Sequence, residues 1–171
     1  MKKFIFIFIF FLSISFNSYA ASPYFLDFKY VLNNSAAGKK AQTFLKSKLD
    51  KGIKSIQEKE KNLLSEEKKL IEQKKILSSE DYKNKVNELR SKVSSLQKER
   101  NSLLNSVAKQ RAKAKNELLK TLNPIIKEYM KENNIRMVLH KKSLLLADEN
   151  LEITDQIIKR LDKKLKSIKL N

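Results

Sequence analysis

The chain has 171 residues, two glycines, one histidine, no cysteine and a formal net charge of +18 at pH 7. The lack of cysteine excludes a disulfide framework and a thiol nucleophile. A lone histidine excludes a histidine-rich metal site, and two glycines leave no phosphate-cradling loop. We therefore expect neither enzyme activity nor a cofactor.

The first twenty residues have the three parts of a secretory signal peptide. Met1 to Lys3 give a positive start, Phe4 to Phe16 form an apolar run, and Ser18 to Ala20 form a small-x-small cleavage site. The run has 13 residues, fewer than the roughly 20 that span a bilayer, which favours cleavage over an uncleaved anchor. We expect residues 1–20 to be a signal peptide, the mature chain to begin at Ala21 and the protein to be periplasmic.

A short strand is expected directly after the mature start. Pro23 bounds the segment 24–28, in which Tyr24, Leu26 and Phe28 would share one face. Residues 29–34 then form a short helix or a turn before the chain enters the arm.

Residues 39–123 are expected to form a long helical hairpin, here called the arm. Leu or Ile recurs every seven residues on both sides of a serine-rich turn. The first helix carries Leu49, Ile56, Leu63, Leu70 and Leu77; the second carries Leu89, Leu96 and Leu103, with Val86, Val93 and Val107 on its companion seam. Ser78 and Ser79, followed by Glu80 and Asp81, should stop one helix and cap the next. Folding about this turn pairs Leu70 with Leu89, Leu63 with Leu96 and Ile56 with Leu103, unless the register slips by half a heptad.

The companion seam of the first helix is weak, because the apolar Ile53 is followed by charged residues at its next three positions. Glu60, Glu67 and Lys74 stand where a tight coiled coil would place Val or Ile, and Glu60 is placed to meet Arg100 across the hairpin. The arm should therefore be compliant along this side. Pro124 should kink or restart the second helix where arm and body join, although a kink without function is the alternative.

The C-terminal part is expected to complete a small body. Residues 135–140 alternate apolar and polar, 141–142 can turn and 143–147 can return, which predicts a β-hairpin. Thr154 is a good N-cap for a last helix with an apolar stripe. The prediction is an α+β, mostly α chain, with a discontinuous body and oligomerisation domain (21–38 and 124–171) from which the arm projects.

The order of these segments resembles the Skp family, also called the OmpH-like periplasmic chaperones. The likeness rests on the export signal, the short strand, residues 30–35 and 36–40, the hairpin, and residues 135–155. Membership implies a homotrimer with a small β-barrel hub and three tentacle-like arms around a cavity. It also implies ATP-independent holding of unfolded outer-membrane β-barrel proteins. A basic, partly apolar cavity wall would suit such clients, because many carry negative charge.

Two sets of side chains are candidates for contacts. The candidates for the body core or the trimer interface are Leu26, Phe28, Met137, Leu139 and Leu145, since a small sheet with open edges is a natural site of assembly; burial in the core of a monomer is the alternative. The densest basic segment is Lys109, Arg111, Lys113 and Lys115, which are candidate contacts for clients, anionic phospholipid or lipopolysaccharide. A solvated helix surface is the alternative for this segment.

Other function classes fit less well. His140, the single histidine, lacks a strained serine turn or an evident carboxylate partner, so we expect it to be structural at a strand end. Nucleic acid is disfavoured as a partner because the chain is exported and its mature aromatic residues are scattered. The remaining alternative is an envelope coiled-coil scaffold or adaptor that binds one folded partner.

Overall fold

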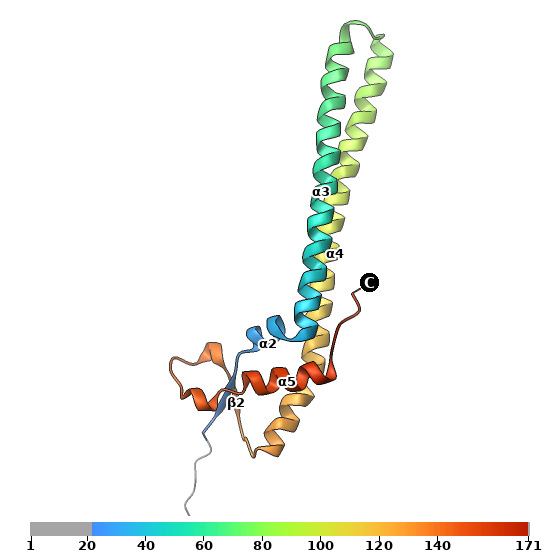
Figure 1. Cartoon of the computed structure of the whole chain (residues 1–171). Coiled ribbons are helices and arrows are strands. Elements are labelled where there is room, and N and C mark those ends of the chain that lie inside the picture. The colour runs from blue at the N-terminus through green and yellow to red at the C-terminus, as the bar shows by residue number, and fades with distance from the viewer. Residues whose placement is uncertain (1–21, 171) are drawn as a thin grey trace, which may run out of the picture.

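The computed structural model describes residues 22–170, so the expected signal peptide and the mature start at Ala21 lie outside the described residues. A two-helix arm rises from a small body (Figure 1). The elements, in chain order, are β1 (Tyr24–Leu26), α2 (Phe28–Asn34), α3 (Ala36–Glu72), η1 (Gln73–Lys75), α4 (Ser79–Glu132), β2 (Val138–His140), η2 (Lys141–Ser143), η3 (Glu149–Leu151) and α5 (Thr154–Lys164). Within residues 22–170, no helix is both long and apolar enough to cross a membrane.

The arm turns where the serine-rich segment predicted. The Ser78 hydroxyl accepts a hydrogen bond from the backbone N–H of Asp81, and Glu80 and Asp81 occupy the first turn of α4, where the helix dipole favours acids. The first helix ends earlier than expected. It stops at Glu72 and tightens into the 3-10 turn η1, so the serines cap α4 and do not end α3.

Cross-hairpin ion pairs fix the register of the arm. Glu60 meets Arg100 at 3.3 Å, as predicted, and Lys92 meets Glu66 at 2.6 Å. A slip of half a heptad would move such partners about 5 Å apart along the axis, so the predicted register holds. Exposed ion pairs add little stability, and the apolar seam holds the helices together.

Only part of the predicted zipper is deeply buried. Ile56, Leu70 and Leu96 are buried between the helices, whereas Leu63 and Leu103 are half-buried. Val93 of the companion seam is half exposed. The arm thus consists of two helices, and single apolar layers alternate with polar layers at the interface between them.

The strand region differs from the prediction. The predicted β-hairpin over 135–147 is wrong, because β2 pairs with β1 in parallel, with Phe25 opposite Leu139. After β2 the chain enters η2, where His140 Nδ1 accepts from the backbone N–H of Lys142, and it does not reverse. It then passes to the other edge of β1, where Phe25 bridges Glu152, also in parallel. The returning strand at 143–147 does not form.

The first strand is shorter than predicted. It ends at Leu26 because the Asp27 side chain accepts from the backbone N–H of Tyr30 and caps α2. Phe28 therefore belongs to a helix and not to the strand face that Tyr24 and Leu26 were expected to share with it.

Thr154 does not cap α5, in contrast to the prediction. Ile153 occupies the N-cap position without a side-chain bond, and Thr154 is the first helical residue. The buried Thr154 hydroxyl instead accepts from the backbone N–H of Asp27 at 3.0 Å and donates to Glu152 Oε1 at 2.7 Å. Lys141 also donates to Glu152 at 2.8 Å. This network joins β1, η2 and the start of α5.

The core of the body lies between α2, α5 and the base of α4. Its fully buried side chains are Leu26, Val31, Leu122, Ile125, Ile153, Ile157 and Leu161. The expected restart at Pro124 is wrong, because α4 runs through this residue to Glu132. Ile125 and Ile126, on the turn that follows, are buried in the core, and their packing favours an unbroken helix. Leu118 and Leu122, which the predicted boundary assigned to the arm, also lie in this core.

Two further contacts fix the arm to the body. The backbone N–H of Ala36, at the start of α3, donates to the Asp162 carboxylate of α5 at 2.7 Å. The C-terminal segment returns to the base of the arm, where Leu170 is buried against Ala41, Leu45 and Ala114. The lower arm is therefore held by the body, and the upper arm stands free (Figure 1).

Candidate functional site

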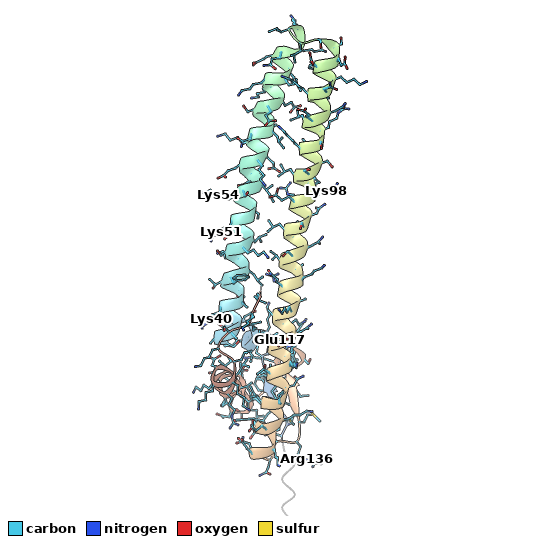
Figure 2. The ribbon with its side chains drawn as sticks, turned by 90° about the vertical axis from the view of Figure 1, so that its right-hand side faces the viewer. Lys40, Lys51, Lys54, Lys98, Glu117 and Arg136 are labelled. Carbon is cyan, nitrogen blue, oxygen red and sulfur yellow. The ribbon has the colours of Figure 1, made fainter. Side chains whose placement is uncertain are left out.

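The arm extends away from the body (Figure 1). Side chains project from α3 and α4 all along the hairpin, and Lys51, Lys54 and Lys98 extend outward from it (Figure 2). One hollow between the helices lies beside Leu70 and Leu89 near the tip. Among residues 22–170, no group of three or more His, Cys, Asp or Glu side chains could hold a metal ion. The exposed surface of the arm is therefore the candidate site.

The charge on this surface is mostly positive and mostly unpaired. Within the arm as described, three basic side chains reach a carboxylate: Lys59, Lys92 and Arg100. The hydrogen bond to Glu66 raises the pKa of Lys92, so this lysine stays charged at neutral pH. The other lysines and arginines of the arm leave a positive field around both helices.

The predicted basic segment does not form a single patch. Lys109, Arg111, Lys113 and Lys115 are all exposed on α4. Each step of two residues turns about 200° around a helix, so neighbours in this set point to opposite sides. Lys109 and Lys113 share one side, and Arg111 and Lys115 share the other. Binding of lipid or client by these residues stays a prediction.

The five candidate body residues lie in different environments. Leu26 is fully buried, and Phe28 packs partly buried against the same core. Leu139 is half-buried, Met137 is 55% exposed and Leu145 is 101% exposed. The core of a single chain thus accounts for Leu26 and Phe28. Contact of Met137 and Leu145 with another copy of the chain stays a prediction.

His140 lies at the end of β2, as expected for a structural residue. Its ring stacks against Phe28, with 5.6 Å between centroids, and its Nδ1 atom caps the next turn. Both contacts stabilise the fold locally.

One set of residues on the arm was not predicted from the sequence. Several large apolar side chains are 41–60% exposed on the hairpin: Phe44, Ile53, Leu64, Ile71, Val93 and Leu104. A heptad count identifies the buried seam. It does not identify these positions, except Ile53 and Val93, which were assigned to the companion seams of their helices. Their signal is a spacing of eleven residues, from Ile53 to Leu64 and from Val93 to Leu104.

Comparisons with known proteins find one matching family model and similar chains. The family model for outer membrane proteins of the OmpH-like kind matches residues 24–161, from β1 into α5. An uncharacterized protein of Aquifex aeolicus (strain VF5) is 30% identical over 139 residues, which cover 81% of this chain and 84% of that protein.

A solved structure shows the same fold. It is a crystal structure from Caulobacter crescentus CB15, of a chain described as a candidate outer membrane chaperone (OmpH-like). The two chains superpose with a TM-score of 0.79 at 20% sequence identity, over 87% of this chain and 89% of that chain. The arm and the body together are therefore a shared architecture.

Proposed function

The chain belongs to the OmpH-like family of outer membrane proteins, as its sequence predicted, and we propose that it is an ATP-independent periplasmic chaperone. Its clients are unfolded outer-membrane β-barrel proteins. It holds them in a basic, partly apolar cavity between arms and so prevents their aggregation.

The observation that carries this proposal is the surface of the arm. It combines unpaired positive charge with half-exposed Ile, Leu and Val side chains. Such a surface fits a partner that has no fixed shape. An unfolded barrel protein exposes apolar strand segments and negative charge, and weak contacts at many points hold it without selecting one sequence.

Assembly into a homotrimer would multiply these contacts. Within the described residues β2 pairs only with β1, so its outer edge is free for a strand of another copy. Exposed apolar side chains lie close to β2 in sequence, at Met137, Leu145 and Leu146. Three arms on a common hub would convert weak contacts into useful avidity.

The test is an aggregation assay with the chain from Ala21 onward. A urea-unfolded porin is diluted into buffer with and without the purified protein, in the absence of nucleotide, and turbidity is followed. We expect the protein to keep the porin soluble at a concentration at which light scattering shows a trimer. Failure with several porins would contradict the proposal, and binding of a single folded envelope protein instead would favour a scaffold.

A further inference from the structure

The two lateral faces of the arm differ in chemistry. Ile53, Leu64 and Ile71 of α3 and Val93 and Leu104 of α4 are between 41% and 60% exposed. We call the surface that carries these five side chains the apolar face. Helical spacing and the ion pair between Glu60 and Arg100 place them on one side of the hairpin.

Helical spacing aligns these residues on each helix. Eleven residues are close to three turns and seven are close to two turns, so Ile53, Leu64 and Ile71 form one stripe along α3. Val93 and Leu104, also eleven apart, form one stripe along α4.

An ion pair joins the two stripes. Glu60 lies within the stripe of α3, seven residues after Ile53 and four before Leu64. Arg100 has the same position on α4, seven after Val93 and four before Leu104. Because Glu60 and Arg100 meet at 3.3 Å, both stripes face the same side of the hairpin.

The register then places the apolar side chains at common heights. The cross-hairpin pairs set Ile53 level with Leu104 and Leu64 level with Val93. The apolar face is thus a ladder whose first two rungs are about 16 Å apart, at 1.5 Å per residue. The ion pair lies between these rungs.

The opposite lateral face carries Phe44 at the base of the arm, five helical turns before Asn62, and is polar beyond this residue. Its cross-hairpin contacts are the ion pairs Lys59–Glu99 and Lys92–Glu66, each at 2.6 Å, and a hydrogen bond from Lys48 to Gln110 at 3.0 Å. These residues are turned about a third of the helix circumference or more from the apolar stripes. Asn62 of α3 and Ser95 of α4 are exposed on this polar face, level with Leu64 and Val93.

Basic side chains flank the apolar face. Helical spacing puts on or beside its stripes the exposed residues Lys46, Lys68, Lys75, Arg90, Arg111 and Lys115. Glu60 is neutralised by Arg100, and the other carboxylates close to the stripe of α3 are Asp50 and Glu67, fewer than the flanking basic residues. The face therefore joins apolar surface to net positive charge, which complements an extended chain that carries both apolar and acidic side chains.

We propose that the apolar face is the side of the arm on which an unfolded client docks, and that the polar face is turned away from it. This proposal rests on the chaperone function proposed above. The occupant is an extended segment of an unfolded acidic outer-membrane protein. Its apolar side chains contact the rungs, and its carboxylates meet the flanking lysines and arginines.

A pair of matched double variants tests the side. L64Q/V93Q makes one rung of the apolar face polar, and N62Q/S95Q adds the same two glutamines at the same height on the polar face. The dissociation constant of a fluorescently labelled urea-unfolded porin is measured for each full mature chain. Thermal unfolding and light scattering check that both variants fold and assemble like the parent.

The expected result is face-specific. L64Q/V93Q should weaken binding about fivefold or more, because each arm loses two apolar contacts, and N62Q/S95Q should bind like the parent. Equal binding by both variants, or an equal loss in both, would overturn the assignment of the face while leaving the chaperone function intact. Absence of binding by the parent itself would instead contradict the proposed function.

Discussion

Replacement of Gly38 by alanine should destabilise the junction between α2 and α3. A Cβ atom at Gly38 would lie 1.9 Å from the backbone oxygen of Leu32 and 2.9 Å from Ser35 Oγ. The first distance is far below the roughly 3.3 Å at which a carbon meets a carbonyl oxygen. Because the obstacle is backbone and not a flexible side chain, α2 must move away from α3.

The magnitude follows from two opposing effects. Overpacking costs about 1–3 kcal/mol, and the upper part of that range applies when the backbone has to shift. Alanine recovers up to about 1 kcal/mol of helix propensity relative to glycine. The net loss in the free energy of unfolding is about 2 kcal/mol, which lowers Tm by about 4–8 °C for a chain of this size.

Gly52 provides the matched control. A Cβ atom there would lie 2.4 Å from Leu103 Cδ2, the end of a half-buried side chain that can rotate. Gly52→Ala should therefore stay within about 1 kcal/mol of the parent, because propensity offsets the contact. Thermal unfolding of both variants, at one protein concentration because assembly contributes to stability, gives the comparison. A Gly38→Ala variant as stable as the Gly52→Ala variant would contradict the predicted clash with the backbone of α2.

Three further predictions concern the body. Leu122→Ala should cost about 2–5 kcal/mol in urea unfolding, because this side chain is fully buried in the core; a change below about 1 kcal/mol would contradict its place there. Leu145→Ser should leave the thermal unfolding of a dilute single chain unchanged, because the residue is 101% exposed, and should shift light scattering toward smaller species if the interface prediction holds. Hydrogen bonds from Lys141 and from Thr154 lower the pKa of Glu152. The contribution of this carboxylate to stability is therefore present at neutral pH and is lost as pH falls through the lowered pKa. Glu152→Gln should flatten the acid side of the stability curve, and an unchanged slope would count against the network.

The sequence predicted the arm well because the arm is local. Heptad spacing and the charges of Glu60 and Arg100 are enough to align two helices joined by a short turn, and both the serine cap and this ion pair were confirmed. The apolar face was missed because a heptad count looks for the buried seam, while the spacing of Leu64 and Ile71 places them beside it.

The body was harder to predict because its contacts are distant in sequence. Parallel pairing of β1 with β2 joins residues more than a hundred positions apart, and alternation along 135–147 gives no information about direction. The Thr154 hydroxyl was expected to cap the last helix locally. It instead accepts a hydrogen bond from the backbone N–H of Asp27, 127 residues away. Leu145 has an apolar side chain that suits a strand, yet no strand forms to bury it.

We propose that the client is held by the arm and not by the body. A photocrosslinking amino acid placed at Leu64 on the arm, or at the exposed Lys159 on α5 of the body, can be irradiated with a captured urea-unfolded porin. We expect crosslinks from position 64 and few from position 159. Crosslinks from the body site with none from the arm would contradict it.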